Sequence, residues 1–132
     1  MRRAVPALLA AVVGLSSCGP TETRSRPTET GRYLVFWTPV PAPIPFNALF
    51  DLEVEWMLSD GLPPDPASTI QLDVRMPAHG HGMQTAPTVE VTAPGRATVR
   101  GLKFHMQGLW ELRFIVQDIG AQDLAIFNED FL

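Results

Sequence analysis

The sequence has only one cysteine, Cys18, so the chain cannot form an internal disulfide. It also has no excess of basic residues, because 10 Lys and Arg stand against 14 Asp and Glu. Without a basic patch the chain has nothing to attract nucleic acid or anionic lipid head groups, so we exclude nucleic-acid binding. An acidic balance of this kind is an ordinary route to solubility.

Two further features are missing. No stretch after the N-terminal segment has the 3.6-residue hydrophobic period of a helix. No Ser or Thr lies in a motif that presents a nucleophile, and the acidic residues do not cluster as a pocket of perturbed carboxyl groups would require. Glu53 and Glu55 lie on a polar face and are interpreted as solvated. We therefore predict that the protein is not an enzyme.

The N-terminal segment, residues 1–17, is typical of a secretory signal peptide. Its charged start is followed by an apolar run from Ala4 to Leu15, which is too short to span a bilayer. The small residues before Cys18 resemble a bacterial lipoprotein cleavage site, so we predict that Cys18 becomes the lipidated first residue of the mature chain. The resemblance to sorted lipoproteins implies the outer membrane, if the cell has one, because Gly19 and not an aspartate follows the cysteine. The alternative is an ordinary signal peptide followed by an unrelated cysteine.

The mature chain is predicted to begin with a disordered tether, residues 18–32. After the cysteine this segment has no apolar side chain, so nothing offsets the entropy cost of ordering it. A tether of this kind lets the domain stand off the membrane while acyl chains hold its end. Cleavage of the signal also removes Arg2 and Arg3, which leaves 8 of the 10 basic residues against 14 acidic ones.

Residues 33–132 have the pattern of one β domain. Apolar residues at every second position from Phe46 to Leu58 alternate with polar ones, and this period of two indicates a strand with one buried face. Tyr33–Trp37 is predicted to be an edge strand because Pro39 and later prolines stop it. The predicted strands are Tyr33–Trp37, Phe46–Leu58, Ile70–Met76, Thr88–Thr92, Ala97–Met106 with a bulge at Gly101, Trp110–Val116 and Leu124–Phe127. They indicate an all-β, immunoglobulin-like antiparallel β-sandwich of about seven strands, with a small open barrel as the competing architecture.

The segment from Met76 to Met83 gathers two of the three histidines and two of the five methionines. Copper accepts both thioether and imidazole ligands, whereas zinc favours the histidines. His79 and His81 alternate with glycines, which permit unusual backbone angles, so both rings could turn toward one ion. We predict a copper site with His79, His81 and Met83 as its leading ligands.

Three residues outside this trio are reserve ligands: His105, Met76 and Met106. If Ala97–Met106 is a regular strand, His105 points away from the face that Met106 occupies, so His105 can join the site only where a loop or bulge interrupts the strand. Met76 and Met106 also continue the apolar alternation of their strands and can simply fill the core.

Structural interpretations of the other prominent residues stay open beside the metal site. His79 and His81 can cap a turn by hydrogen bonding to the backbone. Trp110 shares its alternation with Leu112 and Phe114 and is interpreted as a core anchor rather than a binding platform.

A family resemblance rests on several fragments taken together. These are Met76-Pro77, His79-Gly80-His81-Gly82-Met83, Pro87, the turn at Gly95, Leu102–Met106 and Gly108 with Trp110-Glu111-Leu112. They resemble the YtkA-like and FixH-like domains of bacterial envelope proteins, over roughly residues 46–127. The resemblance implies an immunoglobulin-like sandwich outside the cytoplasmic membrane and, for the FixH branch, an association with copper supply to respiratory oxidases. The chain differs from membrane-spanning FixH proteins, which keep an N-terminal helix.

These observations lead to one functional hypothesis and two alternatives. We expect an envelope protein, anchored by Cys18 in the outer membrane and facing the periplasm, that binds copper for storage or for delivery to a metal-handling or respiratory-complex partner. The first alternative is a metal-free interaction or scaffold module. The second, zinc-assisted catalysis, needs three convergent side chains and an open coordination position. Histidine rings more than about 8 Å apart would exclude a shared ion.

Overall fold

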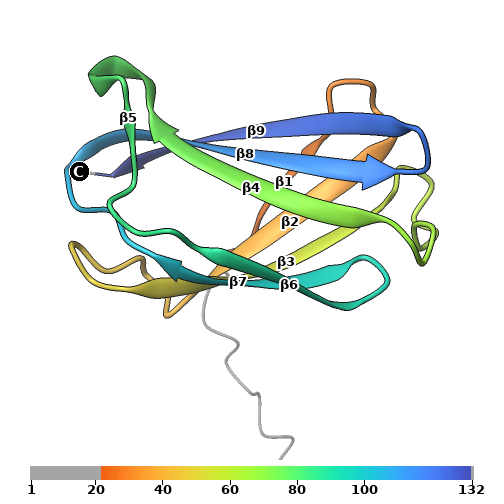
Figure 1. The fold of residues 1–132 in the computed structure, drawn as a ribbon, viewed down its shortest axis with the longest axis horizontal. Helices are drawn as coiled ribbons and strands as arrows, with labels where there is room; N and C mark the ends of the chain where they lie inside the picture. Colours follow the sequence, from red (N-terminus) through yellow and green to blue (C-terminus); the bar gives the residue numbers. More distant parts are fainter. Residues whose placement is uncertain (1–21, 132) are drawn as a thin grey trace, which may run out of the picture.

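The computed structural model describes residues 22–131 and arranges them in two antiparallel sheets (Figure 1). The strands are β1 (Arg24–Pro27), β2 (Tyr33–Val40), β3 (Phe50–Leu58), β4 (Thr69–Met76), β5 (His81–Gly82), β6 (Thr88–Ala93), β7 (Arg96–Leu102), β8 (Gly108–Asp118) and β9 (Ala121–Phe131). One sheet has the order β1-β2-β3-β7-β6 and the other the order β5-β4-β8-β9. Among residues 22–131 no helix is long and apolar enough to span a membrane. The predicted signal peptide, residues 1–17, and Cys18 lie outside the described residues.

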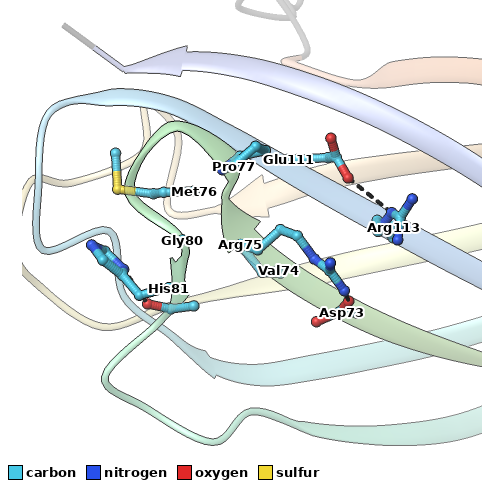
Figure 2. A pocket seen from close by; sticks show the side chains of 10 residues that line it. Asp73, Val74, Arg75, Met76, Pro77, Gly80, His81, Glu111 and Arg113 are labelled. Atoms are coloured by element: carbon cyan, nitrogen blue, oxygen red, sulfur yellow. Dashed lines mark hydrogen bonds and ion pairs between the residues drawn. The ribbon is translucent and has the colours of Figure 1, made fainter.

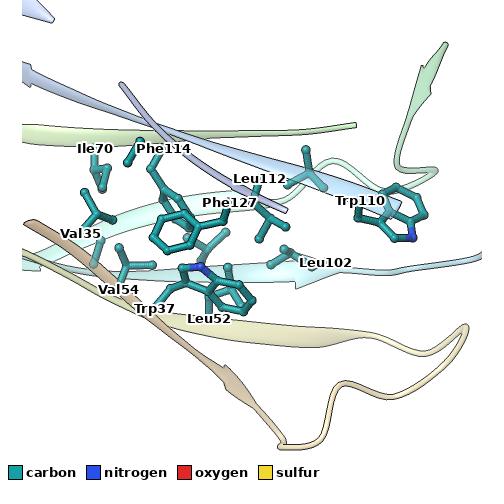
Figure 3. Close-up of a cluster of buried hydrophobic side chains, with 14 of the residues drawn as sticks. Val35, Trp37, Leu52, Val54, Ile70, Leu102, Trp110, Leu112, Phe114 and Phe127 are labelled. Carbon is teal, nitrogen blue, oxygen red and sulfur yellow. The ribbon is translucent and has the colours of Figure 1, made fainter. Parts of the chain in front are cut away.

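The core lies between the two sheets and is built from every second residue of their strands. β2 alternates buried and half-buried positions along nearly its whole length, as a strand with one inward face requires. Figure 3 shows Trp37 and Leu52 from one sheet and Leu112 and Phe114 from the other in the same apolar layer. The predicted all-β, immunoglobulin-like sandwich is confirmed, and each of the seven predicted strands is present. The strand predicted over Phe46–Leu58 begins only at Phe50, so that prediction is wrong for residues 46–49.

β1 lies inside the segment predicted to be a disordered tether, and that prediction is wrong for residues 24–32. β1 pairs with β2, with Arg24 opposite Trp37. The Arg24 guanidinium lies 4.7 Å from the centre of the Trp37 ring, and its Nε donates to Glu129 at 3.1 Å. Because cation–π and charge-assisted contacts hold this strand, it needs no apolar side chain of its own.

The position of β2 in the sheet also differs from the prediction. β1 covers one side of β2, so β2 is an inner strand and not an edge strand. It continues through Pro39 to Val40. The ladder between β1 and β2 ends at Trp37, so Pro39 lies beyond the paired part of β1, where a residue without a backbone N–H is tolerated.

β7 ends at Leu102, so the predicted strand Ala97–Met106 extends too far. The predicted bulge at Gly101 is confirmed, because the register of β3 against β7 shifts between Phe50 and Leu52. Gly101 has φ +88°, and its N–H donates to Asp51 Oδ1 at 3.1 Å. Residues 103–107 consequently form a loop, and His105 is freed from the alternation of a strand.

Four chain segments meet at one end of the sandwich, which we call the histidine end: residues 41–49, 77–83, 103–107 and the end of β9 (Figure 1). Two of the segments are tied together, because the Asn47 N–H donates to the Phe104 carbonyl oxygen at 2.9 Å. The loop 103–107 also carries the chain from one sheet to the other, since β7 and β8 belong to different sheets.

The opposite end is closed by a polar contact between the start of β2 and the end of β8. The Tyr33 hydroxyl donates to Asp118 Oδ2 at 2.5 Å. Burial raises the pKa of Tyr33 to about 12, and the Asp118 carboxylate adds to this effect. The same hydrogen bond is the main reason why the pKa of Asp118 is lowered.

Candidate metal centre

The loop between β4 and β5 carries His79 and His81. Pro77 begins a short 3-10 turn (η1, Pro77–His79), where its fixed φ suits the first helical position. Gly80 ends the turn with φ +67°, a conformation that residues with a side chain rarely adopt, and its N–H donates to the Met76 carbonyl oxygen at 3.0 Å. The chain then returns antiparallel to β4, so the two histidines lie on either side of Gly80.

Three histidine rings lie close together at the histidine end. The centre of the His81 ring is 5.6 Å from that of His79 and 5.5 Å from that of His105. Two imidazoles on one ion have ring centres about 5 to 6 Å apart, because each bond to the metal is about 2.0 Å and each nitrogen lies about 1 Å from its ring centre. Both separations fall within this range. Because residues 103–107 form a loop and not a strand, the His105 side chain can lie beside His81.

The ring nitrogens of His81 and His105 have different surroundings. His81 Nδ1 lies 2.9 Å from the Gly82 carbonyl oxygen, and the tautomer that donates this bond leaves the lone pair of Nε2 free. Metal-bound histidines commonly hold their ring in this way. His105 Nδ1 is buried and has no hydrogen-bond partner in the described part of the chain. Because a buried polar atom without a partner is costly, a ligand at this nitrogen would be stabilising.

An aromatic floor, formed by Phe104 and Trp110, lies beneath the histidines. The two rings stack with centres 4.7 Å apart, and both are fully buried. The Trp110 ring meets His105 edge-on at 5.5 Å and His81 at 6.5 Å. Its Nε1 donates to the Met106 carbonyl oxygen at 3.0 Å, which fixes the loop against β8. The interpretation of Trp110 as a core anchor is confirmed, but the alternation pattern contains no sign of its contact with two histidines.

The candidate methionines are divided between the core and its border. Met76 is 1% exposed, so it fills the core as its alternation predicts. A Cβ atom added to Gly108 would lie 3.0 Å from Met76 Cε, which shows how closely the thioether is packed. Met83 and Met106 are half-buried and pack against the core from its edge. Their side chains are therefore more accessible than that of Met76.

Within residues 22–131, no three His, Cys, Asp or Glu side chains form a ready-made metal-binding group. The histidine rings thus lie close together, but their nitrogen atoms are not arranged around a common point as metal ligands would be. His79 and His81 are exposed, and glycines flank them, so their rings can rotate without disturbing the core. The donor set of imidazoles and thioethers fits copper.

A groove of about 540 Å³ runs from His81 along the outer face of β4 and β8. Figure 2 shows its charged side chains as two pairs, Arg75 with Asp73 and Arg113 with Glu111, the second at 2.8 Å. The sequence did not identify these four residues as a group, because only the register of β4 against β8 brings the two pairs side by side. Since each carboxylate faces an arginine, the groove carries balanced charge beside the histidines.

Comparison with protein-family models, curated proteins and solved structures gave no match. The resemblance to YtkA-like and FixH-like domains therefore stays a prediction based on the residues that carry it. The function has to be argued from the histidine end itself.

Proposed function

We propose that the protein is a lipid-anchored, copper-binding β-sandwich of the bacterial cell envelope, which stores the ion or delivers it to a partner. The observation that supports this most strongly is the approach of three imidazole rings from two loops, at 5.5 and 5.6 Å between centres. His105 Nδ1, buried and unpaired among the described residues, adds to it. Imidazole with thioether is a donor set that suits copper better than harder cations.

His81 is the central ligand in this proposal, because its ring is the one close to both others. His79 and His105 bind from either side. Met83 and Met106 supply thioethers from the border of the core and favour Cu(I). Met76 remains a reserve ligand, since its side chain is packed in the core.

The cellular setting in this proposal rests on the N-terminal sequence. Cys18 is the acylated residue, and Gly19 after it favours the outer membrane, with the domain facing the periplasm. A metal-handling protein or a respiratory complex of the envelope is the proposed partner. The role is binding and exchange of the ion rather than catalysis.

Copper titration of the full mature chain tests the proposal. The protein is purified in detergent and titrated with Cu(II) in air and with Cu(I) under anaerobic conditions, while the histidine NMR resonances and tryptophan emission are recorded. We expect one equivalent to shift all three histidine signals. Bound Cu(II) should also quench Trp110, because this ring lies 5.5 and 6.5 Å from two of the histidines. Unchanged spectra at stoichiometric copper would end the proposal.

Substitutions separate the roles of the ligands. His81→Ala should weaken copper binding more than His79→Ala or His105→Ala, because it removes the ring that both neighbours share. Met83→Leu should weaken Cu(I) binding with little effect on Cu(II). Met57→Leu is its matched control, since Met57 lies on β3 next to Leu58, away from the histidine end, and it should change neither affinity.

A metal-free interaction module is the second candidate function. The observation that favours it is the lack of a ready-made group of three ligands within residues 22–131. In that case a His79→Ala, His81→Ala double variant keeps both its stability and its partner, with or without copper. Capture of a partner that depends on copper and is lost in the double variant would count against it.

A further inference from the structure

Large apolar side chains are exposed around the histidine end. Val40, Phe46, Leu49 and Leu109 have between 45% and 64% of their surface accessible. Phe46 stacks on Phe131 with ring centres 6.0 Å apart, so the exposed ring is held in place and not free to fold back. We call these four residues the apolar rim. Exposed apolar groups that share one end of a molecule indicate a contact surface.

The N-terminal part of the described chain leads to this rim. β1 runs antiparallel to β2, so going from Arg24 toward the N-terminus follows β2 toward Val40. The Thr23 hydroxyl lies 2.7 Å from that of Thr38, which keeps the chain on this course beyond the end of β1. Residue 22, the first described, therefore lies close to the rim.

The length of chain between residue 22 and Cys18 decides which end of the domain an anchor at Cys18 holds. Four residues span at most about 14 Å, even when fully extended. β8 alone has 11 residues and runs from the histidine end to the opposite end, a distance of about 34 Å. If the domain stands upright on an anchor at Cys18, the apolar rim therefore faces the membrane and the opposite end, about 34 Å away, does not reach it.

The charges near the rim indicate the kind of surface that it fits. Arg24 is paired with Glu129. Asp51 lies opposite Val40, Asp130 lies opposite Leu109, and Lys103 follows the end of β7, so these residues give no net positive charge near the rim. This balance gives no attraction to anionic head groups. Contact with a zwitterionic leaflet through apolar side chains fits the rim better.

We propose that the apolar rim is a membrane-facing surface, with Phe46 and Leu49 at its tip dipping into the zwitterionic phospholipid leaflet that holds Cys18. This inference rests on the lipid anchor of the proposed function and is independent of copper. It orients the molecule with the histidine end toward the membrane and the Tyr33–Asp118 end toward the aqueous compartment.

Tryptophan variants of the full, lipidated chain test the orientation. Phe46→Trp places an extra indole in the rim, and Ile119→Trp places one at the opposite end, where Ile119 is 81% exposed. Each variant is reconstituted into phosphatidylcholine vesicles with brominated or ordinary acyl chains, and folding is checked by circular dichroism. Brominated lipid should quench the additional emission of Phe46→Trp at least twofold and leave that of Ile119→Trp unchanged.

Equal quenching of the two variants, or quenching of neither, would overturn the membrane-facing rim even when the anchor is present. Mass spectrometry of the mature chain separates this result from failure of the anchor. If Cys18 carries no acyl mass, the anchor is wrong, and the orientation inferred from it is wrong too. Copper titration of the same samples reports on the metal site independently of either result.

Discussion

Replacing Phe104 with leucine tests how far the aromatic floor stabilises the histidine end. Phe104 is fully buried and contacts three rings, stacking on Trp110 at 4.7 Å and meeting Phe50 at 5.0 Å and Phe131 at 5.8 Å edge-on. Leucine remains apolar and fills much of the same space. The substitution therefore removes mainly the three ring–ring contacts.

Phe114→Leu is the matched control. Phe114 is buried to the same extent, but in the described part of the chain it has one such ring contact, with Phe127 at 5.6 Å. An aromatic pair contributes about 0.5 to 1.5 kcal/mol to stability beyond the area that it buries. With three ring contacts removed, Phe104→Leu should lose about 1.5 to 4.5 kcal/mol of unfolding free energy from this source. Phe114→Leu removes one such contact and should lose about 0.5 to 1.5 kcal/mol. The loss of apolar atoms is common to both variants. We expect Phe104→Leu to lower the free energy of unfolding by about 1 to 3 kcal/mol more than Phe114→Leu.

Urea titrations followed by far-UV circular dichroism measure this difference, with the slopes compared to confirm that unfolding exposes the same surface. Copper affinity is then measured for both folded variants, and it should fall only for Phe104→Leu, because the loop that carries His105 loses its support. Equal costs, or a larger cost for Phe114→Leu, would refute the idea that the floor adds stability beyond burial.

Three other predictions follow from the same structure. Gly95→Ala should lower the free energy of unfolding by about 3 kcal/mol or more, because its Cβ would lie 2.5 Å from the Trp56 carbonyl oxygen at φ +76°. Gly31→Ala, with the same φ and no described atom within 4 Å of the new Cβ, should cost only about 1 to 2 kcal/mol in the same urea assay. Because the pKa of Tyr33 is raised from 10.0 to about 12, its contribution to stability is complete below pH 10 and is lost as the pH rises through 12. Unfolding curves of Tyr33→Phe should lack this alkaline step, and a step of unchanged size would assign it to another group. Removing copper with a chelator should lower the melting temperature, because an ion at one hundred times its Kd adds about 2.7 kcal/mol to the stability of the folded state. An unchanged melting temperature after chelation would show that the folded state does not bind the ion.

The alternation of apolar and polar residues predicted the sandwich because inward positions along strands such as β2 and β8 carry most of the burial. β1 escaped this reasoning because its stability comes from the contacts of Arg24 with Trp37 and Glu129, residues far from it in the sequence. β5 has two residues, too few to show any period. The polar network of a fold is therefore less visible in its sequence than the apolar one.

The candidate site, like the fold, was predicted only in part from the sequence. His79 and His81 lie two positions apart on one loop, so their proximity follows from spacing. The approach of His105 depends on where β7 ends, which the bulge at Gly101 and the bond from Asn47 to Phe104 determine. The glycine at position 101 predicted the bulge, but the bond from Asn47 to Phe104 is a backbone contact that no pattern of side-chain types encodes. For Met76 the sequence was sufficient, because its place in the apolar alternation of β4 predicted that it lies in the core.

If the histidine end binds an ion as proposed, the two ends of the sandwich are held by different chemistry. His79 and His81 belong to a loop of one sheet, while His105 lies on the crossing from the other sheet. An ion bound by all three histidines would connect the two sheets at this end. At the opposite end, the hydrogen bond between Tyr33 and Asp118 connects them. Metal scarcity would then release one end of the molecule and extreme pH the other, so the two stresses should open the domain from opposite sides.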